Sequence, residues 1–226
     1  MKKTVFGLAF LLFAVYVPAS VFCQEWDRAR LDTARSVTYL TTEEKDVILE
    51  MNMARSNPSR YAEMYIRPRL EWFGGPLGDD YYRRPGENVY IRQPGGRDSL
   101  VNAINAISRI QGRPPLSPSR GMSLAARDHT LDIGPSGMMS HTGSNRSTLR
   151  DRVQRYGRWE GGLGEAISYG YGTAREIVVQ LLISQGHRDI LMNGEHRYAG
   201  PSIGAHSVHS HMCTIKFAHR FTDRQP

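Results

Sequence analysis

Apolar residues recur at helical spacing in five segments of the chain, and we expect a helix in each. The first begins at Thr41, because Thr41-Thr42-Glu43-Glu44 has the residues of a capping box, and it continues past Asn57-Pro58 for a turn or two to Ile66. The other four are expected from Asp98 as a cap, from Ser117 to about Asp132, from Ser147 to Gly157, and from Thr173 to Ser184. The positions expected to face the core are Val47, Ile48, Met51, Ala54, Leu100, Val101, Ile104, Ile107, Leu124, Ala125, Ala126, Leu131, Ile177, Val178, Leu181 and Leu182.

Alternating apolar and polar residues predict three strands, and all of them lie in the last third of the chain. They run over Leu163–Tyr171, Tyr198–His206 and Ser210–His219, and the last points Cys213, Ile215 and Phe217 inward. Helices therefore come first and a hairpin comes last. This order favours an α+β fold, a three-layer α-β-α sandwich with a small antiparallel sheet.

Two segments lack a clear pattern. Residues 24–40 are polar and indicate an N-terminal arm or linker before a domain at 41–226. Residues 67–97 are rich in proline, glycine and aromatic residues, which is typical of an inserted loop. Its aromatic side chains would either contact a ligand or pack the insert onto the domain: Trp72, Phe73, Tyr81, Tyr82 and Tyr90.

The first residues have the three parts of a secretory signal peptide. Met1-Lys2-Lys3 is charged, Val5 to Val17 is apolar, and Pro18-Ala19-Ser20 ends the apolar run. We expect cleavage after Cys23, so that residues 1–23 are removed and the exported protein begins at Gln24. A lipid-anchored Cys23 and an uncleaved anchor are the alternatives.

The composition of the chain excludes some classes of protein but does not identify the function. The 226 residues are 40% hydrophobic and 23% charged, which is a globular composition, and the two cysteines cannot form a disulfide scaffold. Cys213, inside a strand, is expected to be a small buried hydrophobe. The net charge is +7 and comes almost entirely from scattered arginine. No nucleic-acid-binding motif accompanies it, so we expect a basic surface, with attraction to an anionic polysaccharide or membrane as the alternative.

All eight histidines follow residue 128, and two of them lie in segments typical of a cleft. His141 and His187 are each beside glycine or a small residue, as Glu165 is, and such positions let a side chain point out of close-packed backbone. Two imidazoles and a carboxylate can form a divalent-metal site with an open position. The histidines are far apart in sequence, however, so separate structural or surface roles stay open.

Four segments, in order and spacing, resemble the CAP superfamily of cysteine-rich secretory, antigen 5 and pathogenesis-related proteins. The single-domain bacterial SCP-like members are the most similar, and the likeness runs from about Glu43 to Phe217. Asn52-Met53-Ala54-Arg55 and Ile203-Gly204-Ala205 resemble further family segments. The four segments are Leu124-Ala125-Ala126-Arg127-Asp128-His129, Ser140-His141-Thr142-Gly143-Ser144, Gly164-Glu165-Ala166-Ile167-Ser168-Tyr169-Gly170-Tyr171, and Gly186-His187-Arg188-Asp189-Ile190-Leu191-Met192-Asn193.

The resemblance implies an α-β-α sandwich whose cleft is lined by two histidines and two acidic residues. His141, Glu165 and His187 match three of these positions, and the histidines would hold zinc or another divalent metal weakly. Ser184 replaces the fourth, acidic residue, so water or Glu176 would complete the set. The family's usual tryptophan on this helix and its usual asparagine after the glutamate are also replaced, by Leu181 and Ala166.

Glu87 and His129 are of the residue types that line the cleft, but neither is expected to belong to the site. Glu87 belongs to a Gly-Glu-Asn triplet, yet it precedes both histidines and lies in the insert, so we interpret it as a loop residue. His129 is expected on a helix near the cleft floor, hydrogen-bonded to a backbone carbonyl or to Asp132.

The resemblance favours a secreted protein that binds an extracellular small molecule, lipid, glycan or peptide in this cleft. Association with the cell envelope is a further expectation, and nucleic acid is not an expected partner. The alternative is a metal-assisted hydrolase, a peptidase or esterase with Glu165 as base. A purely structural or interaction role is the third interpretation.

Overall fold

The computed structural model describes residues 26–224, so the expected signal peptide and the start at Gln24 lie outside the described residues. The helical elements are α1 (Arg28–Leu31), α2 (Thr42–Ser56), α3 (Pro58–Tyr61), η2 (Ala62–Ile66), η3 (Arg67–Trp72), α4 (Gly96–Ile107), α5 (Arg120–Ile133), α6 (Leu149–Gln154), α7 (Ala174–Ile183) and α8 (Gln185–Leu191). The strands are β1 (Tyr81–Tyr82), β2 (Ile91–Arg92), β3 (Ser117–Pro118), β4 (Gly157–Tyr169), β5 (Tyr198–His206) and β6 (Ser210–Asp223).

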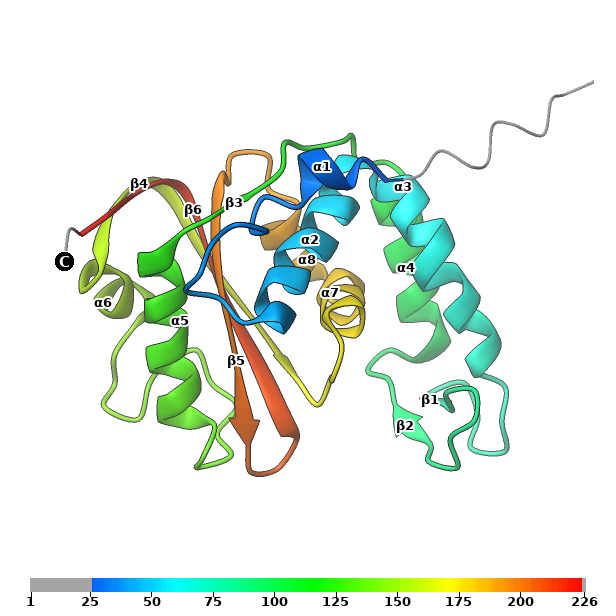
Figure 1. Ribbon diagram of the computed structural model, residues 1–226. Helices are drawn as coiled ribbons and strands as arrows, with labels where there is room; N and C mark the ends of the chain where they lie inside the picture. The colour runs from blue at the N-terminus through cyan, green and yellow to red at the C-terminus, as the bar shows by residue number, and fades with distance from the viewer. Residues whose placement is uncertain (1–25, 225–226) are drawn as a thin grey trace, which may run out of the picture.

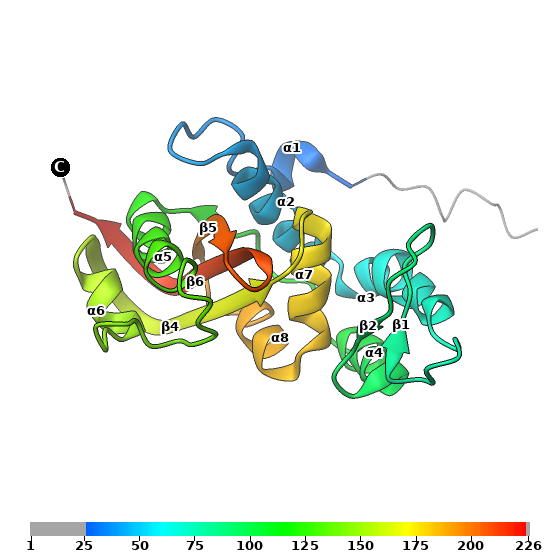
Figure 2. The ribbon, with the colours of Figure 1, turned by 90° about the horizontal axis from the view of Figure 1, so that it is seen from below.

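The chain folds as the three-layer α-β-α sandwich that the sequence predicts. A four-stranded sheet of order β3-β5-β6-β4 forms the middle layer, with α5 and α6 on one side and α2, α7 and α8 on the other (Figure 1). Its three long strands are antiparallel, and the two-residue β3 pairs parallel with β5 at the edge. The view from below shows β1, β2, α3 and α4 grouped beyond α7 (Figure 2).

Helix α2 shows how local sequence and burial agree. Thr41 accepts a hydrogen bond from the Glu44 backbone N–H, and the Glu44 carboxylate accepts one from the Thr41 N–H, which is the expected capping box. The four positions expected to face inward, Val47, Ile48, Met51 and Ala54, are all buried. The helix therefore docks onto the sheet layer along its predicted stripe.

Strand β6 lies at the centre of the packing and is buried from Met212 to Ala218 on both faces, with Cys213 among its buried residues. Gly200 on the neighbouring β5 lets α5 come close to the sheet. A Cβ at this position would lie 2.2 Å from the Ser123 backbone nitrogen, so only glycine fits. Helix α5 and the sheet are thus in near backbone contact.

Residues 26–40 are an arm packed on the domain. Leu31, Ala34 and Leu40 are buried in the main core cluster. Asn52 of α2 donates hydrogen bonds to the Leu31 and Leu116 carbonyls and accepts one from the Leu116 N–H. The buried amide therefore ties the arm to the domain.

The strand expected from Leu163 begins earlier, at Gly157, and the last strand runs on to Asp223. Four predictions about the helices were also wrong. The helix expected from Asp98 begins at Gly96, because the left-handed Gly95 precedes it. Ser117-Pro118 forms β3 instead of opening a helix, and Ser119 caps α5 by accepting from the Met122 N–H. Thr148, rather than Ser147, caps α6. Leu131 is 66% exposed because it falls on the outer face of α5.

The insert packs its aromatic residues against one another and against the core. Tyr82 is buried, and its ring centre lies 6.0 Å from that of Trp72 and 5.6 Å from that of Phe73. Phe73 also contacts the main core cluster. These contacts favour the packing interpretation. Arg84 of the insert lies 3.3 Å from Glu176 at the start of α7, which anchors the segment.

Among residues 26–224, no helix is both long enough and apolar enough to cross a membrane.

Candidate functional site

Glu165 lies in the middle of β4 and is the centre of a buried hydrogen-bonded cluster. Its Oε1 accepts a hydrogen bond from His141 Nδ1 at 2.7 Å. Its Oε2 is contacted by Lys216 Nζ and by Arg152 Nη2, the latter at 3.2 Å. The carboxylate is 2% exposed, so both oxygens are satisfied by protein groups rather than by bulk water.

Arg152, on α6, connects this carboxylate to the loop that carries His141. Its Nη2 also donates to the His141 carbonyl at 2.8 Å, and its Nη1 donates to the Ser147 carbonyl at 2.7 Å. The planar guanidinium can hold several acceptors at fixed angles. Arg152 therefore fixes both the backbone and, through Glu165, the ring of His141.

His187, in the short helix α8, faces His141. Their ring centres are 6.5 Å apart, with an interplanar angle of 49°. The His141 side chain is 59% exposed, so its ring is the solvent-facing end of the Glu165 cluster. The structure thus brings together the three residues that the sequence singled out, His141, Glu165 and His187, from three different elements.

The surroundings disfavour the protonated form of both imidazoles. Although its side chain is largely exposed, partial desolvation lowers the pKa of His141, and the nearby Lys216 and Arg152 charges lower it further. Burial and the neighbouring His141 lower the pKa of His187. With Nδ1–H of His141 donating to the carboxylate, its Nε2 is left as an acceptor or ligand.

Two cavities lie on either side of this histidine pair. One, of about 610 Å³, is lined by His141 and Glu165 together with α8 residues. The other, of about 660 Å³, is lined by His187, by β4 and α7, and by the insert. The pair therefore stands where the two cavities approach each other.

The donor set fits a weakly held metal ion at most. Within residues 26–224, no group of three or more histidine, cysteine, aspartate or glutamate side chains is arranged to hold an ion. Both carboxylate oxygens of Glu165 accept hydrogen bonds from His141, Arg152 and Lys216, so they are not free to bind a metal ion. Two neutral imidazoles remain as ligands, and their rings would have to move slightly closer to share one zinc ion at about 2.0–2.1 Å per Zn–N bond.

The other candidates have separate roles. Glu176 pairs with Arg84, so it does not complete the site as expected. Ser184, in place of the family's acidic residue, is the N-cap position of α8. Glu87 is exposed in the insert, as interpreted from its position. His129 is buried on α5 and its Nε2 donates to the Ser140 carbonyl at 2.8 Å, which confirms the carbonyl partner.

Sequence reasoning missed Arg152 and Lys216. Lys216 is the only lysine of the last strand and stands among apolar residues, in the stretch Cys213-Thr214-Ile215-Lys216-Phe217. A lone cation in a buried strand indicates a buried carboxylate partner, and this signal was available. Arg152 carries no comparable signal, because 25 arginines are scattered over the chain.

Comparison with known proteins finds one matching family. A family model described as CAP, the cysteine-rich secretory protein family, matches residues 101–217, which is just over half of the chain. No curated protein matches significantly.

Three solved bacterial structures are similar at low identity. An outer surface protein from Borrelia burgdorferi is 18% identical (TM-score 0.42), over 46% of this chain and 77% of that one. An extracellular protein with an SCP domain from Bacillus anthracis is 22% identical (TM-score 0.39; 55% and 38% covered). A cysteine-rich secretory protein from Staphylococcus aureus is 14% identical (TM-score 0.39; 70% and 48% covered).

Proposed function

We propose, from the premise that this chain belongs to the CAP family of cysteine-rich secretory proteins, that it is exported and binds an extracellular amphipathic ligand in the cavity beside His187. Removal of residues 1–23 and location outside the cytoplasm or at the cell envelope are part of this proposal. Their support is the charged, apolar and small-residue pattern of the N-terminus.

The observation that carries the proposal is the lining of the 660 Å³ cavity. Its size lies in the range of small-molecule sites. Aliphatic and aromatic side chains from the sheet, α7 and the insert form a large part of its wall: Tyr82, Ile91, Pro94, Ile167, Tyr169, Tyr171, Leu181 and Ile183. Such a wall would desolvate an apolar chain or ring.

The charged residues that line the cavity indicate the polar head group of the ligand. Arg84 and Arg92 line it from the insert, His187 lines it from α8, and no carboxylate is among the described lining residues. Arg84 is partly neutralised by Glu176, whereas Arg92 is exposed and has no carboxylate within 4 Å in the described part of the chain. We therefore favour a long-chain carboxylate, a lipid-like ligand, over a neutral glycan or a basic peptide.

A divalent metal such as zinc, if bound, would be held by the nitrogens of His141 and His187 and would act as a Lewis acid toward a ligand head group. Glu165 would orient His141 through Nδ1, in the manner of a carboxylate that supports a ligating histidine. Arg152 and Lys216 would hold that carboxylate in place. Two protein ligands imply exchangeable rather than structural metal.

Hydrolysis is the second candidate, because the 2.7 Å contact between Glu165 and His141 is the arrangement of an oriented general base. No serine, threonine or cysteine side chain in residues 26–224 is hydrogen-bonded to His141, however, so a protein nucleophile is not in place. A water activated by His141 is the remaining route.

The test is titration of the refolded or secreted protein with cis-parinaric acid, a fluorescent long-chain carboxylate, and with its methyl ester. We expect saturable binding of the acid, and at least several-fold weaker binding of the acid to Arg92→Gln. Ile91→Trp should fill the cavity and abolish binding of both compounds. Arg30→Gln, an exposed arginine on α1, is the matched control and should bind as the wild type does.

Two results would overturn the proposal. Unchanged affinity in Ile91→Trp would move the ligand out of this cavity. Turnover of a p-nitrophenyl ester that is lost in His141→Ala would instead establish the hydrolase, with a chelator distinguishing metal-dependent from metal-free chemistry.

A further inference from the structure

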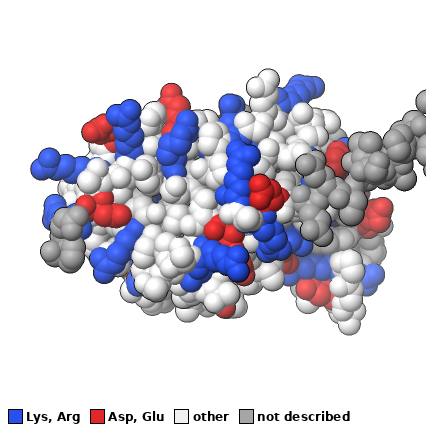
Figure 3. Space-filling view, turned by 45° about the horizontal axis from the view of Figure 1, so that its top comes forward, with Lys and Arg blue, Asp and Glu red and all other residues white. Residues whose placement is uncertain are grey.

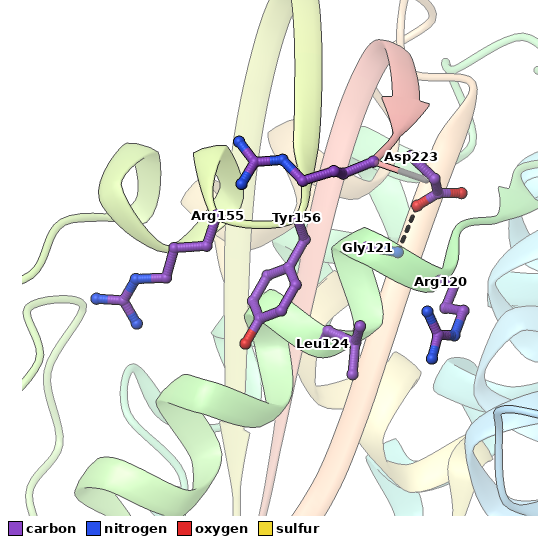
Figure 4. Close-up of a pocket in the computed structure, with 7 residues that line it drawn as sticks. Arg120, Gly121, Leu124, Arg155, Tyr156 and Asp223 are labelled. Atoms are coloured by element: carbon purple, nitrogen blue, oxygen red, sulfur yellow. Dashed lines mark hydrogen bonds between the residues drawn. The ribbon is translucent and has the colours of Figure 1, made fainter. Parts of the chain in front are cut away.

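A separate hollow lies at the end of the sheet where the chain reaches Arg224, and it shares no residue with either cavity at the histidine pair. Its volume is about 600 Å³. The start of α5, the turn after α6 and the end of β6 line it, through Arg120, Gly121, Leu124, Arg155, Tyr156, Asp223 and Arg224 (Figure 4).

A smaller hollow of about 480 Å³ adjoins it and is lined by Gln154, Gly157, Arg158, Trp159 and Arg224. Because Arg224 lines both, the two hollows are adjacent, and we treat them together as one site. We call this the arginine groove, defined by Arg120, Arg155, Arg158 and Arg224 together with Tyr156 and Trp159.

The carboxylates near the arginine groove are already occupied by protein donors. Asp128 accepts from Arg155 Nη1 at 2.9 Å and from the Tyr156 hydroxyl at 2.8 Å. Asp223 accepts from the Gly121 backbone N–H and from the Ser119 hydroxyl, so it caps the start of α5 (Figure 4).

Three of the four arginines in the groove have no such carboxylate partner within residues 26–224. Among the described residues, Arg120, Arg158 and Arg224 have no carboxylate within 4 Å of their guanidinium groups. All four arginines of the groove are exposed. Lys and Arg side chains are spread over this view, its left end included, with acidic ones between them (Figure 3). The groove therefore carries a surplus of positive charge that favours an anionic ligand.

The arrangement of these charges distinguishes a polymer from a single anion. Arg120 and Arg155 lie on opposite sides of Tyr156 and do not converge on one point (Figure 4). A lone phosphate or sulfate needs several donors aimed at one position. Separated guanidinium groups along a groove instead fit acidic groups that repeat along a chain.

Aromatic faces add the second element of recognition. Tyr156 and Trp159 are half-buried, and each lines one of the two hollows. Their rings are fixed because both pack against the cluster formed by Met122, Ala125, Val153, Ala218 and Phe221. Rigid rings with a polar edge suit the apolar C–H face of a sugar.

We propose that the arginine groove binds an acidic polysaccharide, with the arginines contacting carboxylate or sulfate groups and the two aromatic rings contacting the sugars. This site is independent of the proposed lipid-like ligand, and it would hold the protein on an anionic glycan matrix while the cavity beside His187 stays open.

The test is calorimetric titration of the full chain with an oligogalacturonate hexamer and a sulfated heparin hexasaccharide. A neutral cello-oligosaccharide and a single-stranded oligonucleotide of equal charge serve as probes of the alternatives. Arg120→Gln/Arg224→Gln is the groove variant. Arg30→Gln/Arg109→Gln removes the same charge from exposed arginines elsewhere and is the matched control.

We expect at least one acidic hexasaccharide to bind, the groove variant to bind it at least fivefold more weakly, and the control variant to change affinity less than twofold. The neutral oligosaccharide should not bind. Trp159→Phe should keep most of the affinity but lose the change in tryptophan fluorescence that binding causes. His141→Ala should bind the glycan as the wild type does, which separates this site from the proposed cleft ligand.

Three outcomes would overturn the proposal. An equal loss in the control variant would mean that net charge alone attracts the glycan. Tighter binding of the oligonucleotide than of either hexasaccharide would assign the groove to another polyanion. No binding of either acidic hexasaccharide at low ionic strength would refute it outright.

Discussion

Glu165 on β4 and Lys216 on β6 stand directly opposite each other in the sheet register, and their side chains form a buried ion pair beneath His141. Lys216 is fully buried and Glu165 nearly so. Burial and the neighbouring Arg152 lower the pKa of Lys216, whereas the charge of Asp128 works against that shift. The pair is therefore sensitive to the loss of either partner.

Lys216→Met should destabilise the protein by about 3–5 kcal/mol, because it leaves the carboxylate with a single cation in a buried site. Glu165→Gln should have a comparable effect. The double variant should cost less than the sum of the two, since no uncompensated carboxylate remains. Urea unfolding of the four proteins gives the coupling energy, and strict additivity would show that the pair does not interact.

Leu181 and Leu131 provide a matched test of the helix predictions. Leu181 on α7 is 1% exposed, so Leu181→Ala should cost about 2–5 kcal/mol. Leu131 on α5 is 66% exposed, so Leu131→Ala should change stability by less than about 0.5 kcal/mol. Chemical denaturation measures both, and similar effects at the two sites would contradict the burial described.

The lowered pKa of the buried His129 predicts that the protein loses stability in acid. Burial and the charge of Arg152 lower its pKa to about 4 in the folded protein. The unfolded value is about 6.5, so the unfolded state binds a proton first. The contribution of His129 to stability is full above pH 6.5 and falls by up to about 3 kcal/mol as the pH drops toward 4.

His129→Gln should flatten this part of the pH profile, because its amide can still donate to the Ser140 carbonyl but does not titrate. His211→Gln, at an exposed position, is the control and should leave the slope unchanged. The measurement is the free energy of unfolding at pH 7, 5.5 and 4.5. A wild-type curve that is flat over this interval would contradict the prediction.

Zinc should bind weakly, at one site, and only while His141 and His187 are neutral. Because the pKa of each is lowered, binding should persist somewhat below pH 6.5 and fade at more acidic pH. Calorimetry should show that His141→Ala and His187→Ala each abolish the site, that His211→Ala does not, and that a chelator removes the ion without changing the thermal transition. Wild-type zinc affinity in either of the first two variants would show that the histidines do not share an ion.

Export should remove residues 1–23. Mass spectrometry of the secreted protein should then give a chain that starts at Gln24, in open or cyclised form. A diacylglycerol-modified Cys23 would instead place the protein on a membrane surface.

Periodicity predicted most of the fold, because the burial of whole stripes leaves a strong pattern. The face of α7 from Ile177 to Leu182 is buried, and β5 has the bounds that alternation predicted, Tyr198–His206. Helix starts were less predictable. Several polar residues near a boundary can cap, and tertiary contacts decide among them, as Thr148 beside Ser147 shows.

The candidate site was predictable only in its outer part. His141, Glu165 and His187 stand out because a resemblance and small neighbours mark them. Arg152 was not predictable, because its role depends on α6 bringing one of many arginines beneath a loop. Whether Glu165 faces a metal or an ion pair depends on its cross-strand neighbour, and register is a property of the sheet that a single strand's pattern does not contain.

The cavity beside His187 has walls of two different origins, and this has a consequence for how such proteins diverge. One wall belongs to the sheet and α7, where a change of residue disturbs the core. The other is the insert at 67–97, which joins the domain through the buried Tyr82, through Phe73 and through the Arg84–Glu176 contact. Its exposed turns, at residues 76–80 and 85–88, can change in length at little thermodynamic cost. Exchange of this segment between relatives would therefore alter the choice of ligand while the histidine pair and its buried support are inherited unchanged.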